Sequence, residues 1–383
     1  MPPKNLALKN RVALHVNASI YFGWLDIRVR RSIETAAADF AVSGTERWAG
    51  QLRPVRIFPG DECWVTIGED RVVTGHVEDV AQSYDAGRRT LTISGRSRTA
   101  DLVDCSASEV PGQIFGMSIE RIADWMAEPY RVEVRAEVDT GPRIPKFQVQ
   151  PGESVHAAIE RLARNHALIV TDDETGALVL TRAGAGRAAG RIKLGENILA
   201  ANGNLSHRQR YSHYVVKGQR DGDDVAEDVG AFSAVEGQAL DRGVRRYRRL
   251  LVVGDSPGGP LDQRRRAQWE ASTRAGRALK VSYTLQGWRD PKGALWRPNA
   301  LVKVEDPWLG IERDLLIVSA AFTLSETGGS TTELELAPKE AYELLPEVTA
   351  AAGAGYLTEK PAEREPKPFK KALPWMLRPL PGR

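Results

Sequence analysis

The chain reads PGDECWVTI at residues 59–67 and then VVTGHVEDVAQSYDAGRRTLTISGRS at 72–97. Much later it reads PNALVKVED at 298–306 and then LIVSAAFTLSETGGSTTELELAPK at 316–339. In both stretches a short strand pattern after proline leads to a long strand, a glycine-bearing hairpin and a final alternating strand. The sequence therefore predicts an internal repeat of one β unit, and chance similarity between two ordinary hairpins is the alternative.

The second copy contains a segment that the first copy lacks. It reads PWLGI at residues 307–311, between the short strand and the long one. Tryptophan is enriched at the energetic centres of protein interfaces. We therefore expect Trp308 and Leu309 to contact a partner, with burial of Trp308 in the core as the alternative. Trp375, far downstream, is the third candidate for partner contact.

The rest of the chain supports a mainly β fold. Short alternating runs punctuated by turn residues extend from Val12 to Arg98 and return after Ile192, a spacing typical of β-sandwiches and barrels. We expect mainly β structure with a small α+β insert and two similar tube-like β-barrel domains. One helix, from Pro260 to Arg277, is expected inside the second β region, because proline suits the first helical turn.

The insert is marked by a change of period after Cys105. Apolar residues at helical spacing predict a helix over 114–126, and Ser154 is suited to cap the N-terminus of a second helix. A turn at 172–176 predicts a hairpin after that helix. The glycine-rich run at 184–190 is interpreted as a flexible connector, since its spacing does not match a dinucleotide-binding loop.

The predicted organisation has four parts: a first β-barrel domain at 1–105, an α+β domain at 106–190, a second β-barrel domain at 191–345 and a Pro-rich basic arm at 346–383. The formal net charge of the chain is +3. Residues 359–383 carry seven basic and three acidic side chains, a net +4, so the remaining body is near neutral at −1. A near-neutral body argues against a dedicated DNA-binding module, because such a domain is clearly basic on one face.

Composition narrows the class of protein. The 383 residues are 42% hydrophobic and 27% charged, which is ordinary for a globular chain and excludes disorder throughout. No stretch approaches the roughly 18 apolar residues of a membrane span, and the N-terminus lacks an apolar signal core. We therefore expect a protein made in a cytoplasm, without stable membrane insertion. Cys63 and Cys105 are too few for a disulfide framework and are expected to be buried thiols.

No pattern of catalytic, cofactor-binding or metal-ligating residues stands out. The six histidines are scattered, and the sequence contains no Cys/His cluster, P-loop, nucleophile elbow or zinc-protease motif. We therefore expect no enzyme activity, no cofactor and no metal. Two basic groups are candidates to line an axial channel for DNA, with solvated surface positions as the alternative: Arg245, Arg246 and Arg248, and then Arg264 and Arg265 in the predicted helix.

Several strings in the chain resemble one family. Residues 94–107 read SGRSRTADLVDCSA, and residues 268–270 read QWE within the predicted helix. QGW at 286–288, LWRPN at 295–299 and DPWLGI at 306–311 follow in the same order. Together they resemble the baseplate hub protein of Mu-like contractile-tailed phages, which is related to the hub part of VgrG proteins in type VI secretion. The resemblance covers roughly residues 10–345 and leaves out the C-terminal arm.

The resemblance implies a homotrimer with two tube-like barrels per subunit, a sixfold face toward the tail tube and a threefold face toward the spike. Its expected partners are further copies of itself, the spike protein, the tail tube and other baseplate proteins, with DNA only in transit. The expected location is the tail baseplate of the virion, assembled in the host bacterial cytoplasm. The family is structural and implies no catalytic residues. The alternatives are the hub of a type VI-like or bacteriocin particle, and a tail-associated cell-wall hydrolase.

Overall fold

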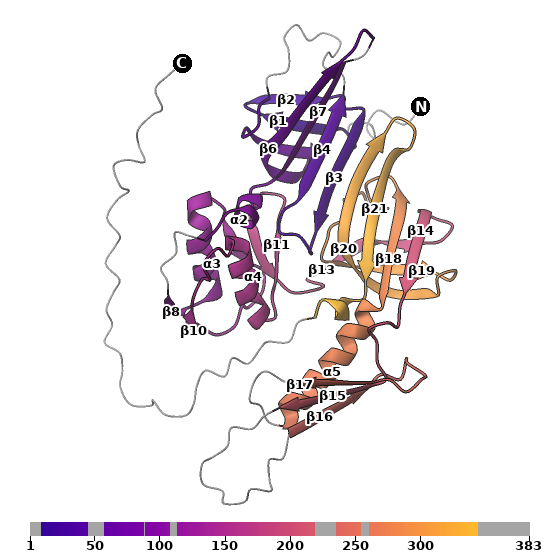
Figure 1. The fold of residues 1–383 in the computed structure, drawn as a ribbon. Coiled ribbons are helices and arrows are strands. Elements are labelled where there is room, and N and C mark those ends of the chain that lie inside the picture. The colour runs from indigo at the N-terminus through magenta and orange to yellow at the C-terminus, as the bar shows by residue number, and fades with distance from the viewer. Residues whose placement is uncertain are drawn as a thin grey trace, which may run out of the picture. The chain divides into compact units, whose positions relative to one another are not determined.

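The computed structural model describes residues 9–44, 57–87, 89–107, 113–218, 235–253 and 260–343. Strands dominate the fold, and the few helices lie in the insert and beside a small separate sheet (Figure 1). The mainly β class expected from the sequence is confirmed.

The first β region contains seven strands. They are β1 (Val12–Val16), β2 (Ser19–Phe22), β3 (Asp26–Ser32), β4 (Asp39–Gly44), β5 (Glu62–Ile67), β6 (Asp70–Tyr84) and β7 (Arg89–Ser97). In the sheet they lie in the order β3-β4-β7-β6-β5-β1-β2. Alternation of side chains along β4 and β7 places Phe40, Val42, Leu91 and Ile93 in the core.

The second β region repeats this order. Its strands in the large sheet are β13 (Gly186–Lys193), β14 (Ile198–Leu205), β18 (Leu279–Gln286), β19 (Ala300–Asp306), β20 (Ile311–Ser325) and β21 (Gly329–Ala337). They lie in the order β14-β18-β21-β20-β19-β13, which matches β3-β4-β7-β6-β5-β1 strand for strand. The long strands β6 and β20 both contain 15 residues, and their hairpin partners β7 and β21 both contain 9. The shared order supports the repeat, although β13 is parallel to β19 whereas β1 is antiparallel to β5.

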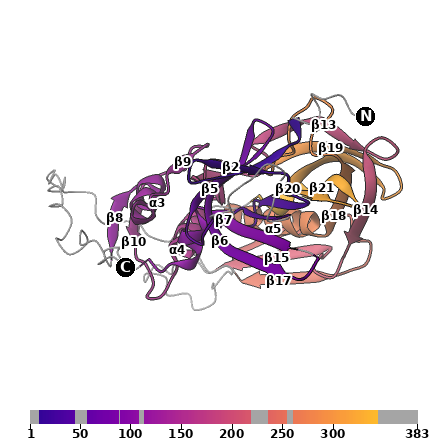
Figure 2. The same ribbon diagram turned by 90° about the horizontal axis from the view of Figure 1, so that it is seen from above.

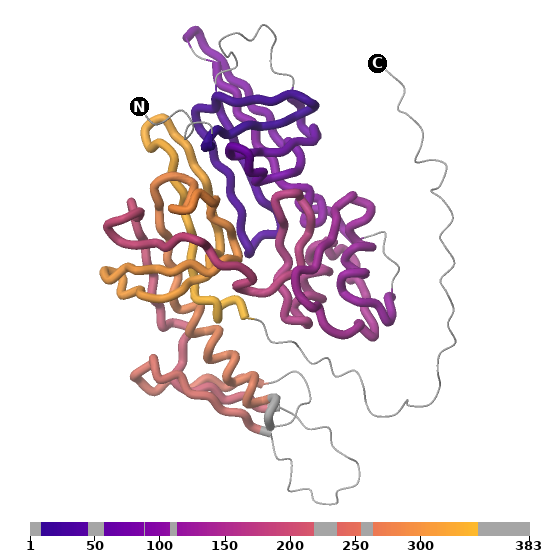
Figure 3. The backbone as a smooth tube through the Cα atoms, turned by 180° about the vertical axis from the view of Figure 1, so that it is seen from behind, coloured from indigo at the N-terminus to yellow at the C-terminus, as the bar shows by residue number. Residues whose placement is uncertain are grey.

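Among the described strands, one pairing joins the sheets of the two copies, which lie side by side in Figure 3. β20 extends beyond its partner β19, and its C-terminal half pairs antiparallel with β3, from Ser319 opposite Ser32 to Leu324 opposite Ile27. This pairing merges both regions into one 13-stranded sheet with a shared apolar cluster. The predicted pair of separate tube-like barrels is therefore not confirmed: the strands of the two copies form one continuous sheet, and no closed barrel is found among the described residues.

The α+β insert has its own apolar core. Its elements are α2 (Ala100–Asp104), β8 (Ile114–Met117), α3 (Ile119–Ala127), the 3₁₀ turn η1 (Glu128–Tyr130), β9 (Val134–Ala136), β10 (Ile144–Phe147), α4 (Val155–Asn165), β11 (Ile169–Asp172) and β12 (Leu178–Thr181). The helix predicted over 114–126 begins later, because β8 pairs with β10 and Gly116 has a φ of +65°. Helix α4 begins as predicted, since Ser154 Oγ accepts a hydrogen bond from the Ala157 N–H at 3.2 Å.

The hairpin of β11 and β12 attaches the insert to the first β region. The carboxylate of Asp172 is buried and accepts a hydrogen bond from the Ala38 N–H at 3.0 Å, and burial raises the pKa of this carboxyl. Arg31 of β3 donates to the Asp172 carbonyl at 2.9 Å, and Thr74 of β6 donates to the Glu174 carbonyl at 2.7 Å. The insert is therefore tied to two strands of the large sheet.

A small three-stranded sheet is inserted in the second β region. β15 (His213–Gly218) lies between β16 (Val235–Leu240) and β17 (Arg249–Val253). Helix α5 (Pro260–Arg277) packs on this sheet, as Figures 1 and 2 show, and it spans the residues predicted for it. A 3₁₀ turn, η2 (Lys339–Ala341), follows β21 and contacts the same helix.

The prediction of a flexible connector at 184–190 is wrong. Most of this run belongs to β13, because its backbone pairs with β19. The small residues suit a crowded position, since a Cβ at Gly190 would lie 2.8 Å from the side chain of Pro291. Glycine is therefore used here for close packing instead of for mobility.

We predict that Gly95→Ala destabilises the protein. Its Cβ would lie 2.2 Å from the His76 carbonyl oxygen and 2.7 Å from the Phe40 ring. Overpacking a tight site costs about 1–3 kcal/mol, so the free energy of unfolding in urea should fall by about that amount. Gly87→Ala is the matched control, because the nearest atom to its Cβ lies 3.8 Å away. Equal losses of stability in the two variants would contradict the prediction.

Candidate functional site

The predicted contact residue Trp308 lies in the turn between β19 and β20, and its side chain is 86% exposed. The turn is organised by Asp306, which is buried. Asp306 Oδ1 accepts hydrogen bonds from the N–H groups of Trp308 and Leu309 at 3.1 and 3.2 Å, and Oδ2 accepts from the Tyr283 hydroxyl at 3.0 Å. Burial and the adjacent carboxylate raise the pKa of Tyr283, which keeps this hydroxyl a donor. A fixed turn therefore presents an indole to solvent.

Leu309 differs from its exposed neighbour. Its side chain packs against the large apolar core, and a Cβ added at Gly203 of β14 would lie 3.2 Å from Leu309 Cδ1. The segment unique to the second copy therefore lies against β14, the last strand at one end of the sheet. Of the predicted contact residues, Trp308 is accessible and Leu309 anchors the turn, while Trp375 lies outside the described residues.

The first group of predicted channel arginines lies in the small three-stranded module and not in the large sheet. Arg245 and Arg246 are exposed ahead of β17. Arg248 is half-buried and donates to the backbone carbonyls of His207 and Arg208 at 2.8 and 2.9 Å. Arg248 therefore fixes the local backbone, whereas the other two side chains are accessible to a ligand.

The second group lies on α5. Arg264 and Arg265 are both exposed. The neighbouring turn of the helix packs closely on β16, since a Cβ at Gly237 would lie 2.1 Å from the Gln263 carbonyl carbon. The module thus has exposed basic side chains from both the helix and the loop before β17, and their role as channel lining stays a prediction.

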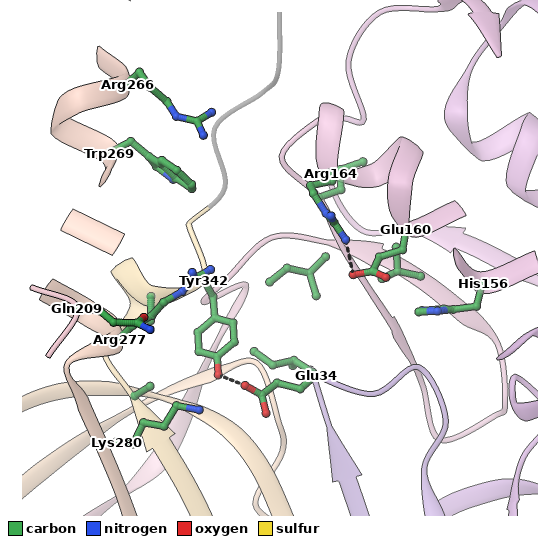
Figure 4. A pocket seen from close by; sticks show the side chains of 16 residues that line it. Glu34, His156, Glu160, Arg164, Gln209, Arg266, Trp269, Arg277, Lys280 and Tyr342 are labelled. Atoms are coloured by element: carbon green, nitrogen blue, oxygen red, sulfur yellow. Dashed lines mark hydrogen bonds and ion pairs between the residues drawn. The ribbon is translucent and has the colours of Figure 1, made fainter. Parts of the chain in front are cut away.

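A groove of about 800 Å³ is lined by residues of α4, α5 and η2 (Figure 4). Both of its carboxylates are engaged: Glu160 forms an ion pair with Arg164 at 3.1 Å, and Glu34 accepts a hydrogen bond from the Tyr342 hydroxyl at 2.5 Å. Burial, together with Glu34, raises the pKa of that hydroxyl. The groove offers polar and aromatic contacts, including Trp269, instead of a free acid–base pair.

The described ranges contain no group of three or more His, Cys, Asp and Glu side chains that could hold a metal ion. None of the helices described is both long and apolar enough to cross a membrane. Cys63 is buried as expected, and burial raises the pKa of its thiol to about 12. Cys105 is only half-buried, so the expectation for it is met in part.

An exposed tryptophan on a fixed turn is typical of a surface that contacts another protein. Three stretches of the chain match protein families. Residues 11–97 match the N-terminal domain of Mu phage baseplate assembly protein GpP-like proteins, residues 99–182 match the second domain of baseplate hub protein gp44-like proteins, and residues 260–345 match the fourth domain of Mu phage baseplate assembly protein GpP.

The chain is also similar to baseplate hub protein gp44 of Escherichia phage Mu, with 31% identity over 88% of this chain and 89% of the relative. Among solved structures, it is similar to the 43 kDa tail protein of prophage MuSo2 from Shewanella oneidensis, with 32% identity, 88% of this chain and 100% of that chain covered, and a TM-score of 0.76. This chain therefore belongs to the family of baseplate hub proteins of Mu-like phages.

More distant structures share the fold. A tail protein from Neisseria meningitidis is 21% identical, with 87% of this chain and 98% of that chain covered and a TM-score of 0.70. The E. coli c3393 protein, a component of the type VI secretion system, is 10% identical, with 85% of this chain and 76% of that chain covered and a TM-score of 0.52. The resemblance noted in the sequence is thus confirmed, and the family members are structural proteins, consistent with a chain that is not an enzyme.

Sequence reasoning missed the exposed strand β14. Leu199 and Leu205 in this strand are 57% and 68% exposed, and both belong to the run ILAANGNL at 198–205. The signal that could have revealed this strand is a run of eight residues without a charge, which lies between two segments that contain charged residues. Small residues at its centre hid the alternation that identifies most strands.

We predict that the turn depends on Asp306 and not on Trp308. Asp306→Ala leaves a buried hydroxyl and two N–H groups without their acceptor, which should lower the free energy of unfolding by about 1–3 kcal/mol. Trp308→Ala removes an exposed side chain and should change it by less than about 0.5 kcal/mol. Urea unfolding of both variants measures the difference. A large loss in Trp308→Ala would show that the indole is part of the fold.

Proposed function

We propose that this chain is a structural baseplate hub that acts as a homotrimer and joins the sixfold tail tube to the threefold spike during assembly and genome ejection. The observation that carries the proposal is the duplicated strand order, β3-β4-β7-β6-β5-β1 and β14-β18-β21-β20-β19-β13. Three chains, each with two similar units, present six similar units around one axis, which is the geometry of an adaptor between threefold and sixfold partners.

The proposed partners are further copies of the chain, the tail tube, the spike protein and other baseplate proteins. The proposed location is the virion tail, after assembly in the host cytoplasm. Within the chain, the four-part division at residues 105, 190 and 345 belongs to the proposal, as does the absence of enzyme activity. A phage tail is favoured over a type VI-like or bacteriocin particle, because the phage relatives exceed 30% identity whereas the secretion-system component shares the fold alone.

The proposal also includes passage of DNA through the hub. The face of the sheet opposite the core has polar and oppositely charged side chains, including Arg30, which lies 3.8 Å from Glu335 and donates to Ser319 at 3.2 Å. A polar face with paired charges suits a duplex that slides past without stable binding, since binding strength grows with the number of unpaired cations at the phosphates.

We expect light scattering on a mixture of the purified chain and its spike protein to detect a complex that contains three copies of the 42.1 kDa chain. Trp308→Ala should weaken the complex, because exposed aromatic side chains provide much of the binding energy of interfaces, about 2 kcal/mol or more at the strongest positions. Gln286→Ala, an exposed side chain at the end of β18, is the control. A chain that stays a monomer with both spike and tube proteins present would refute the trimer.

A further inference from the structure

Strand β14 is an open edge of the large sheet. It pairs with β18 on one side, and among the described residues no strand pairs with its other side. Every residue from Leu199 to Leu205 is exposed, and the strand has no charged residue or proline. Charges and prolines are the usual devices that keep a sheet edge from pairing with another chain. An eight-residue edge without them is suited to accept a further strand.

The second half of β6 is another open edge. Its first half pairs with β5 as far as His76 opposite Glu62, and the backbone of Val77 still bonds to Gly60 and Asp61. Beyond that point the strand bulges between Val77 and Asp79, and the residues from Asp79 to Tyr84 pair only with β7 within the described ranges. Most of them are exposed, and Tyr84 is 85% exposed. This half-strand therefore has backbone groups on one side that can accept a partner.

The repeat shows what fits these two edges. β20 is the counterpart of β6: it also bulges, between Ile317 and Ser319, and its second half lies beyond its partner β19. There it pairs with β3, and β3 is the counterpart of β14. The chain thus forms this joint once, internally, between the second copy and the first. It leaves the two complementary halves of the same joint open, one in each copy.

We propose that β14 of one copy pairs antiparallel with residues 79–84 of β6 in the next copy, so that the joint between β3 and β20 is repeated between chains. This proposal rests on the proposed trimer and identifies the strands that form it. The contact is head-to-tail, because the two edges differ, and head-to-tail contacts close into a ring when the rotation fits. Around a ring of three chains, three internal joints then alternate with three joints between chains.

The internal joint also fixes the register of the new one. Ser319 to Leu324 of β20 lie opposite Ser32 to Ile27 of β3. To transfer this register, each residue of β20 is replaced by its counterpart in β6 and each residue of β3 by its counterpart in β14, with the counterparts matched through the hairpin and sheet pairings. The residues expected to lie opposite each other across the interface are then Asp79 and Ser206, Val80 and Leu205, Ala81 and Asn204, Gln82 and Gly203, Ser83 and Asn202, and Tyr84 and Ala201.

The side chains agree with this register. Val80 packs on the large apolar core, and Leu205 lies opposite Leu279, which packs on the same core. The pairing would bring these two apolar side chains together and cover Leu205, which is 68% exposed. On the other face, Ser83 would lie opposite Asn202, two small polar residues. No like charges are placed opposite each other, so the interface avoids the repulsion that disfavours cross-strand pairs.

Cysteine cross-linking of the full chain tests both the contact and its register. Ser83 and Asn202 are exposed and are predicted to lie directly opposite each other in neighbouring chains. Under mild oxidation, the double variant Ser83→Cys with Asn202→Cys should form covalent dimers and trimers that reduction dissolves. Each single variant should stay uncross-linked, because a head-to-tail contact brings neither residue close to its own copy. Because every variant also contains the half-buried Cys105, a cross-link in a single variant would measure how far Cys105 reacts.

The double variant Ser83→Cys with Asn204→Cys is the control for register. The two cysteines would then be diagonal neighbours, with Cα atoms farther apart than a disulfide spans, so the yield of cross-linked trimer should fall at least several-fold. Equal yields from the two double variants would overturn the proposed register.

Light scattering on the same samples separates this inference from the proposed function. A trimer that does not cross-link through Ser83→Cys and Asn202→Cys would overturn the β14–β6 contact and leave the trimeric hub intact. A chain that stays a monomer with tube and spike proteins present would overturn both. A trimer that cross-links through this pair alone supports both.

Discussion

The structure depends on the antiparallel pairing of β3 with the second half of β20. A 15-residue strand has two sides of backbone donors and acceptors, and a buried strand needs partners for both. β19 covers only the first half of β20 on one side, and β3 covers the rest. The pairing also brings Val29 opposite Phe322, both almost fully buried, so the cores of the two copies become one.

The bulges explain how one strand can serve two partners. In β20 the register shifts between Ile317 and Ser319, at the point where pairing passes from β19 to β3. A bulge bends the strand and increases its twist, so its two halves point to different neighbours. β6 has a bulge at the corresponding place, between Val77 and Asp79. The bend is therefore a property of the repeated unit, and the internal joint did not create it.

Local signals in the sequence predicted what is locally determined. The alternation in β7 and β21, the proline at the start of α5 and the cap at Ser154 all act within a few residues, so the sequence shows them directly. The joint could not be predicted in this way, because its partners Arg30 and Ser319 are 289 positions apart. Strand β13 was missed because its glycines pack closely. The packing of Leu309 against Gly203 joins residues far apart in the sequence, so no local signal shows it.

The repeat also separates the kinds of surface that a trimer can present. Features present in both copies, such as the long bent strands, would occur six times around the axis and suit a sixfold partner. Features present once per chain would occur three times: the Trp308 turn, the α5 module and the α+β insert. The turn lies against β14 through Leu309, so the proposed ring would place each Trp308 beside a contact between chains. Because its first-copy counterpart is the tight turn at 68–69, only three of the six joints would have an indole. Trp308 would thus lie beside the joints between chains and not beside the internal ones. A nearly sixfold ring would in this way keep a face with threefold symmetry.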